Sequence, residues 1–171
     1  MHRNLVSWIP GRRSRQAGFS FVELIITVGM ILVLTTWAMP SFLSYLRGAR
    51  LRAGAQTVSA YLNEGRQLAI KTNGPVCVAH TTSTMQFRTT SCGGGVIAVA
   101  GLVNASSNVR LPENISLSLA SGSSAIFQQL GNAAAGTVYN VTDVPSGQIL
   151  RVIVAVSGRV CLAPATAITC P

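Results

Sequence analysis

The sequence predicts an α+β protein in which one long N-terminal helix packs against an antiparallel β-sheet domain. Three observations lead to this. Residues 19–39 form an apolar run, residues 44–73 place apolar side chains at helical spacing, and apolar positions alternate after Pro75. The 171 residues suffice for one ordinary domain with an appendage. We expect four segments: a basic leader at 1–18, a membrane-spanning half-helix at 19–43, an amphipathic half-helix at 44–74 and a β domain at 75–171.

The first segment, residues 1–18, is basic and contributes +4 of the net charge of the chain. It contains Arg3, Arg12, Arg13 and Arg15 and no acidic residue. Of the formal net charge of +9, +5 remains without it, and +6 if Glu23 is also left out as a membrane residue. This surplus suits DNA or anionic lipid, but the charges are too evenly spread to indicate either partner.

The apolar run at 19–39 is long enough to span a bilayer, which needs about 20 residues. A cleaved secretory signal predicts a shorter core followed by small residues, whereas this run ends in WAMP. A plain signal anchor leaves Gly18 and Glu23 unexplained. A cut between Gly18 and Phe19 explains both, because it creates an α-amine four residues before the Glu23 carboxylate. Each charge is less costly in lipid when the two are paired.

That pair forms either within one helix, where four residues rise about 6 Å, or between neighbouring chains, whose register it would set. Alternatively, Glu23 reaches the headgroups from the first helical turn, where an acid also suits the helix dipole. Residue chemistry alone leaves these interpretations open. Farther along, Pro40 removes a backbone hydrogen bond and crowds the preceding turn, so we expect the helix to loosen there.

The second half of the helix is predicted to be amphipathic. Its apolar stripe is rich in small residues, so another element should pack close against it: Leu51, Ala55, Val58, Leu62, Gly65 and Ala69. Arg52, Gln56, Asn63 and Gln67 lie away from this stripe. Gly74 suits a left-handed cap and Pro75 prevents continuation, so the helix should end near Asn73.

Beyond Pro75 the alternation predicts an antiparallel sheet. A hairpin is expected from Val76–Thr81 and Met85–Thr89, with its turn near Ser83 and Thr84. The further predicted strands are Val96–Ala100, Ile115–Leu119, Ala125–Gln129, Thr137–Val141, Ile149–Val156 and Val160–Leu162.

The four cysteines are Cys77, Cys92, Cys161 and Cys170, an even number in a domain expected outside the cytoplasm. Two disulfides are therefore the favoured interpretation over zinc, since the spacings fit no usual zinc site. The hairpin places Cys77 opposite Cys92, so we prefer Cys77–Cys92 with Cys161–Cys170, although four cysteines allow three pairings. Disulfides place the β domain in the periplasm and the leader in the cytoplasm.

The stretch AGFSFVEL, after a basic leader and before an apolar run, resembles the processing site of type IV prepilins and pseudopilins. The resemblance implies the type IV pilin fold and cleavage by a membrane prepilin peptidase after Gly18. It also implies N-methylation of Phe19, and a role for Glu23 in recruiting a subunit to the fibre by neutralising a neighbour's amine. Pro40 falls where such helices commonly carry a proline.

Three later stretches resemble the C-terminal part of the GspH/FimT group of minor pseudopilins: AIFQQLG at 125–131, GTVY at 136–139 and VIVAVSGR at 152–159. Members are minor subunits of type II secretion pseudopili or type IV pili. Some FimT-type members bind DNA through a C-terminal Gly-Arg-x-Arg motif. Here Gly158-Arg159-Val160-Cys161 lacks the second arginine.

Catalytic chemistry is not indicated, and we expect neither a cofactor nor a metal. His80 alternates with apolar neighbours and is interpreted as structural or surface-exposed, and Gly93-Gly94-Gly95 as a turn. Arg151 and Arg159 would make a modest phosphate site if their strands were adjacent, but no aromatic residues interleave them for base stacking.

The leading hypothesis is a structural, non-enzymatic minor pilin or pseudopilin, inserted once in the inner membrane. Its expected partners are prepilin peptidase, inner-membrane lipid and other pilins, which it meets through the N-terminal helix. The alternatives are a pilus-associated DNA-binding subunit and a membrane-anchored periplasmic protein that never polymerises. The sequence leaves open whether the machine is a secretion pseudopilus or a pilus.

Overall fold

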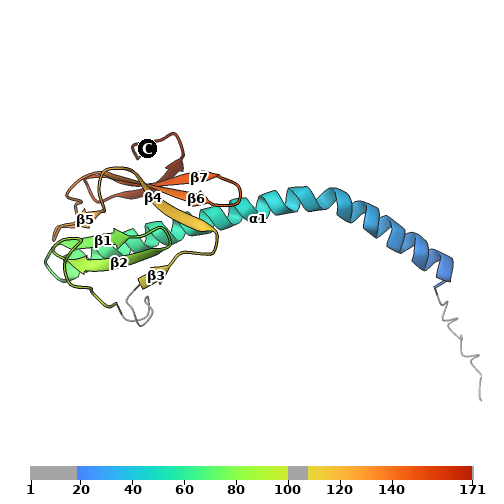
Figure 1. The fold of residues 1–171 in the computed structure, drawn as a ribbon, viewed down its shortest axis with the longest axis horizontal. Helices are drawn as coiled ribbons and strands as arrows, with labels where there is room; N and C mark the ends of the chain where they lie inside the picture. Colours follow the sequence, from blue (N-terminus) through green and yellow to red (C-terminus); the bar gives the residue numbers. More distant parts are fainter. Residues whose placement is uncertain (1–18, 100–107, 171) are drawn as a thin grey trace, which may run out of the picture. The chain divides into compact units, whose positions relative to one another are not determined.

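The computed structural model describes residues 19–99 and 108–170, apart from the side chains at positions 38 and 40. The chain divides into two compact units, Met1–Ser41 and Phe42–Pro171. A long helix precedes a region of antiparallel strands, as Figure 1 shows. The predicted α+β class is therefore confirmed.

The helix α1 covers Phe21–Lys71, 51 residues, close to the predicted extent. It ends in two hydrogen bonds, from the Asn73 amide to the Ile70 carbonyl (3.3 Å) and from the Gly74 amide to the Ala69 carbonyl (3.2 Å). The left-handed residue is Asn73, with φ 48°, and not Gly74 as expected. Asparagine tolerates this conformation, and the two bonds satisfy carbonyls that the helix end would otherwise leave free.

The predicted apolar stripe of α1 is confirmed. All six of its members, from Leu51 to Ala69, are buried, and the four polar residues assigned to the opposite side are exposed. Tyr61 joins the buried face and stacks on Phe87, with the ring centroids 4.2 Å apart. The stripe forms one core with both β-sheets, so α1 packs against each of them.

The strands form two four-stranded sheets. The first has the order β3-β2-β1-β5 and the second β4-β6-β7-β8, and every pair is antiparallel. In chain order the strands are β1 Val76–His80, β2 Thr84–Thr89, β3 Asn108–Arg110, β4 Ile115–Ser121, β5 Ile126–Phe127, β6 Thr137–Asp143, β7 Ile149–Val154 and β8 Val160–Pro164.

Two strand predictions differ from the structure, and one strand was not predicted. The strand expected from Val96 is only a bridge between Val96 and Arg88 within the described residues 96–99, and Ala100 lies outside them. The strand expected at Ala125–Gln129 shortens to β5 because the chain turns at Gly131, with φ 79°. The strand β3 was missed, since three residues are too few to show an alternation.

Small residues let α1 approach the sheets closely. A Cβ added to Gly54 would lie 3.1 Å from the Ile115 side chain on β4. A Cβ added to Gly65 would lie 2.6 Å from Val78 on β1 and 3.1 Å from Phe87 on β2. The glycines therefore set how near the helix lies to the sheets.

Two disulfides are present, Cys77–Cys92 and Cys161–Cys170, the pairing that the sequence analysis preferred. The first ties β1 to the loop after β2. A ring of this size lowers the conformational entropy of the unfolded chain and so stabilises the folded chain by about 3 kcal/mol. The second closes the C-terminal segment onto β8. There Cys161, Ala167 and Cys170 pack on a small outer cluster of Val138, Ile153 and Ala163.

The close approach at Gly65 predicts a measurable penalty for one added methyl group. Gly65→Ala should lower the midpoint of thermal unfolding, although alanine favours a helix over glycine by about 1 kcal/mol. Circular dichroism of the full chain in detergent measures this. The control is Gly48→Ala on the same helix, where an added Cβ meets nothing within 4 Å, and its midpoint should stay or rise. An unchanged or raised midpoint for Gly65→Ala would contradict the packing described here.

Candidate functional site

The N-terminal part of α1 presents an apolar surface on all sides. From Phe19 to Trp37 every side chain is exposed, including Phe19 at 82%. A helix that is apolar all round is normally buried against something else. No residue that the structure describes covers this surface.

The polar groups within this surface are mostly satisfied internally. The hydroxyls of Thr27, Thr35 and Thr36 donate to the carbonyls of Leu24, Leu32 and Val33, at 2.9, 2.9 and 2.7 Å. Because these groups need no water, the segment suits an environment without it.

Glu23 is the exception. It lies in the first turn of α1, where the amide of Leu24 already bonds the carbonyl of Ser20 at 3.1 Å. Its side chain is exposed, and no other described residue forms an ion pair or hydrogen bond with the carboxylate. This negatively charged carboxylate thus has no partner among the described residues, and it lies at the start of an apolar surface. A cation brought to this position would be paired.

The other residues expected to act at this end are only partly described. Gly18 and the leader arginines lie outside the described residues, and so does the bond that would be cut. Pro40 lies within α1 at the junction of the two units, and its effect on the helix stays a prediction.

Among the helices of residues 19–99 and 108–170, none is long and apolar enough to cross a membrane alone. The bent pair of segments Phe21–Trp37 and Ser41–Lys71 satisfies the requirement only jointly, by length and composition.

Arg151 and Arg159, the pair considered for nucleic acid, come from adjacent strands or their ends, as that hypothesis requires, but they do not lie directly opposite each other. Arg151 on β7 lies opposite Ala163 on β8, and Arg159, just before β8, lies opposite Ala155, just after β7. Positions 151 and 155 are four residues apart, so the two arginines are separated by about 13 Å along the strands. Arg151 is also engaged internally. Its Nε donates to Asn140 at 3.1 Å and its Nη1 to the Ala167 carbonyl at 3.0 Å, which holds the C-terminal segment.

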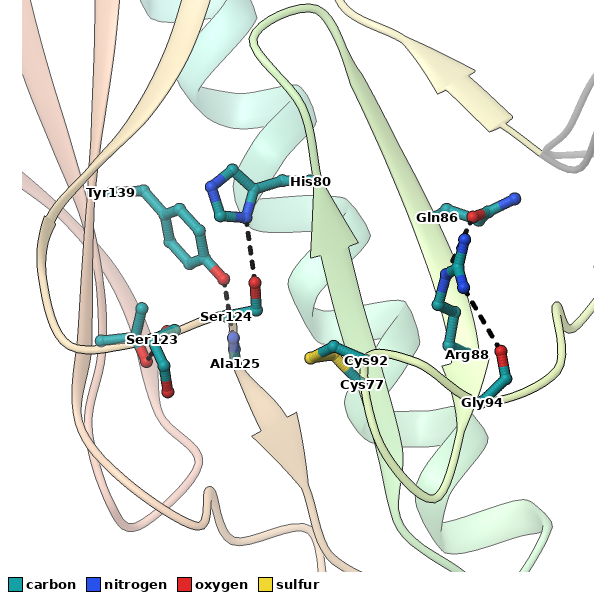
Figure 2. The surroundings of a disulfide bond; sticks show 11 residues. Cys77, His80, Gln86, Arg88, Cys92, Gly94, Ser123, Ser124, Ala125 and Tyr139 are labelled. Carbon is teal, nitrogen blue, oxygen red and sulfur yellow. Dashed lines mark hydrogen bonds between the residues drawn. A yellow bond between two sulfur atoms is a disulfide. The ribbon is translucent and has the colours of Figure 1, made fainter.

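His80 lies where the first sheet meets the second (Figure 2). Its Nδ1 lies 3.2 Å from the Ser124 hydroxyl, and its ring meets that of Tyr139 edge-on, with centroids 5.2 Å apart. The Tyr139 hydroxyl accepts a 2.8 Å bond from the Ala125 amide. The arrangement joins β1, the segment before β5, and β6, so the interpretation of His80 as a structural residue fits these contacts.

Burial shifts the pKa values in this cluster. Desolvation lowers the pKa of His80 from its ordinary 6.5. Desolvation also raises the pKa of Tyr139 to about 12, while its bond from the Ala125 amide acts in the opposite sense. At neutral pH both side chains are therefore uncharged, as a contact between two sheets requires.

The triple glycine forms a turn after Cys92, as predicted. The Gly94 amide donates to the Ser91 carbonyl at 2.9 Å, and the Gly94 carbonyl accepts a 3.4 Å bond from Arg88 (Figure 2). A Cβ at Gly94 would clash with the Thr89 carbonyl, so glycine is required there.

Within residues 19–99 and 108–170, no group of three or more His, Cys, Asp or Glu could hold a metal ion.

Sequence reasoning did not foresee the partners of His80. Ser124 is 44 positions away, and no motif connects it or Tyr139 to His80. Their proximity follows from the crossing of the two sheets, which only the folded chain defines.

His80 predicts how stability depends on pH. The unfolded chain binds a proton near pH 6.5, whereas the folded chain does so only at lower pH. Stability should therefore fall as the pH drops from 7 through 6.5, by no more than about 1.4 kcal/mol per pH unit. Urea unfolding at pH 5.5 to 7.5 measures this. His80→Gln should flatten the profile, and an unchanged slope in that variant would exclude His80 as its source.

The chain is similar to known proteins in its fold but not detectably in its sequence. No protein-family model matches the chain, and no curated protein matches its sequence. Several solved structures match its fold. The type IV minor pilin FimU of Pseudomonas aeruginosa PAO1 matches at a TM-score of 0.54 and 12% identity, covering 68% of this chain and 90% of that one.

The minor pseudopilin EpsH from the type 2 secretion system of Vibrio cholerae matches at a TM-score of 0.52 and 15% identity, covering 69% of this chain and 99% of that one. The solution structure of Escherichia coli GspH matches at 0.54 and 14% identity, covering 68% and 89%. A long helix packed on antiparallel sheets is thus common to all of them. The chain has the type IV pilin fold, in the form found in minor pilins and pseudopilins.

Proposed function

We propose that this chain is a minor pilin or pseudopilin, a structural subunit of a type IV pilus or a type II secretion pseudopilus. It is made as a precursor, cut after Gly18 by a prepilin peptidase and methylated on the new amine of Phe19. The observation that carries the proposal is the uncovered apolar part of α1 with one unpaired carboxylate, Glu23, in its first turn. Such a segment, on a domain with the pilin fold, suits assembly through the helix.

Processing and assembly are linked by charge. Exchanging lipid for neighbouring helices gains little hydrophobic free energy, because lipid tails are as apolar as leucine. A charge costs about 2.5–3.5 kcal/mol at the centre of the bilayer and less toward its surface. Pairing the Phe19 amine with the Glu23 carboxylate of a neighbouring chain removes part of that cost and so favours the assembled state. Before the cut, position 19 is an amide and offers no cation. Cleavage therefore creates the interaction that makes association specific.

Location follows from the same proposal. The apolar segment rests in the inner membrane before assembly, with the leader in the cytoplasm and the disulfide-bonded domain in the periplasm. Arg47, Arg50 and Arg52 are exposed just beyond the apolar run, where lipid phosphates would meet them. This chain acts by assembly and not as an enzyme.

The DNA-binding alternative finds less support. It relied on Arg151 and Arg159 acting together, but Arg151 is bonded to Asn140 and Ala167, and the two lie about 13 Å apart along the sheet. A membrane-anchored protein that never polymerises would share the fold but has no use for a carboxylate four residues after a cut site.

Processing predicts a defined N-terminus. Intact-mass spectrometry of the protein from bacteria with an active prepilin peptidase should find a chain beginning at Phe19 and carrying one extra methyl group. Gly18→Leu should leave the precursor uncut. A native chain that retains Met1 in peptidase-positive cells would refute the processing step.

Assembly predicts a separate effect for Glu23. Glu23→Ala should be cut normally yet be depleted in sheared fibres by about tenfold or more, equivalent to about 1.4 kcal/mol. Glu23→Gln tests charge apart from shape and should be depleted as well. Glu113→Ala, which removes an exposed acid in the β domain, is the matched control. Wild-type levels of Glu23→Ala in the fibres would remove the assembly role of the carboxylate.

A further inference from the structure

A second uncovered apolar surface lies on the β domain. It consists of Ile70, Leu130, Val156 and Ile168, and we call it the distal surface because it lies at the Lys71 end of the unit Phe42–Pro171. All four side chains are half or more exposed, Leu130 at 83%. They come from α1, the turn after β5, the turn after β7 and the C-terminal segment. Contacts between these segments hold the surface together.

Two left-handed glycines make that assembly possible. Gly131 and Gly158 have φ 79° and 78°, and a Cβ at Gly158 would clash with the Gly131 carbonyl. A Cβ at Gly131 would lie 2.9 Å from Ile70. The Ala133 amide also bonds the Val156 carbonyl at 3.0 Å. Leu130 and Val156 therefore project from turns that are packed on one another and on the end of α1.

The surface continues into a groove. Val156 and Ile168 line a depression of about 410 Å³ whose other lining residues include Val138, Ile153 and Cys170. This groove runs over the second sheet beside the segment closed by Cys161–Cys170. An apolar side chain of a partner has a place to enter here.

The charges around the surface have one sign. Lys71 follows Ile70, Arg159 follows Gly158, and both are exposed. Arg66 lies under the two glycines, its Nε 3.0 and 3.2 Å from the positions of their missing Cβ atoms. No aspartate or glutamate occurs in residues 66–71, 128–133, 153–159 or 165–170. The rim is basic.

The charges around the distal surface indicate which kind of partner fits it. From Phe42 onward the chain has nine basic and three acidic residues, so the domains of two copies would repel each other. One of the three acidic residues, Asp143, is also buried and cannot pair with the basic rim of another copy. Nucleic acid would use the basic rim but not the apolar centre, which offers no aromatic ring for a base to stack on. A protein with an apolar contact ringed by carboxylates complements both features.

We propose that the distal surface docks a different subunit of the same fibre, one whose globular domain is acidic. Ile70, Leu130 and Val156 make the apolar contact, and Lys71 and Arg159 pair with carboxylates at its edge. The chain thereby accepts a neighbour of another kind and excludes a copy of itself. This inference rests on the proposed function, since it presumes that the chain enters a fibre.

Photo-cross-linking in living cells tests it with the full-length chain. A photoreactive amino acid, p-benzoylphenylalanine, replaces Leu130 or Val156, and mass spectrometry identifies what is captured. The control position is Val144, which is as exposed as Val156 (63% against 60%) but follows β6 at the opposite end of the same sheet. Positions 130 and 156 should capture a prepilin-type protein with a negatively charged domain, at several times the yield of position 144.

Charge reversal supplies the second arm. Lys71→Glu with Arg159→Glu should reduce capture at position 130 by about tenfold, whereas Arg110→Glu, an exposed arginine on β3, should leave it unchanged. Unchanged melting temperatures establish that the variants fold. Capture of a second copy, of a basic pilin or of nucleic acid would overturn the proposal, as would equal yields at 130, 156 and 144.

Fibre shearing in the same cells separates this inference from the proposed function. If the chain is present in the fibres but captures no acidic subunit at 130 or 156, the docking surface is wrong and the fibre role stands. If an acidic pilin is captured while the chain is absent from fibres, the distal surface does bind an acidic pilin, but the fibre role is wrong and so is docking within a fibre. If no acidic subunit is captured and the chain is absent from fibres, the docking surface and the fibre role are both wrong.

Discussion

The close contact of α1 with both sheets is the interaction on which the rest of the structure depends. Six small or aliphatic side chains from Leu51 to Ala69 form the stripe, and Gly54 and Gly65 bring the helix against Ile115, Val78 and Phe87. Neither sheet encloses the main core alone, since most buried residues of both sheets belong to one cluster that includes α1, and only Val138, Ile153 and Ala163 form a separate outer cluster. The helix therefore supplies the surface that joins two sheets into one domain.

The same helix leaves its other half uncovered. Between Phe19 and Trp37 the side chains are apolar but exposed, and the threonine hydroxyls are satisfied by carbonyls of their own helix. One half of α1 thus stabilises the domain, whereas no described residue covers the other half. Under the proposed function, this division lets a subunit exchange lipid for helices without unfolding the domain, because the two surfaces belong to different compact units.

Charge distribution distinguishes positioning residues from residues free to bind. Arg151 holds the C-terminal segment through Asn140 and Ala167, and Arg88 bonds Gln86 and the Gly94 carbonyl. Lys71 and Arg159 are exposed at the edge of an apolar surface. His80 and Tyr139 stay uncharged at the contact between the sheets because burial opposes their ionisation. Only some members of a basic sequence are therefore available to a partner.

The sequence by itself determined the elements that repeat over many residues. The helical stripe, the hairpin with its disulfide and the later strands of six or seven residues are local patterns, since 3.6- and 2-residue periods place side chains whatever the rest of the chain does. The candidate assembly residues Phe19 and Glu23 could also be proposed from the sequence, because their chemistry depends on adjacency along the chain, and their role stays a prediction. The short strands β3 and β5 and the cap at Asn73 were not, since their form depends on neighbours brought from elsewhere. Only the tertiary structure decided that there are two sheets, that His80 meets Ser124 and Tyr139, and that Arg151 is hydrogen-bonded while Arg159 is exposed. Each of these depends on how strands distant in sequence cross over one helix, and no local pattern encodes that crossing.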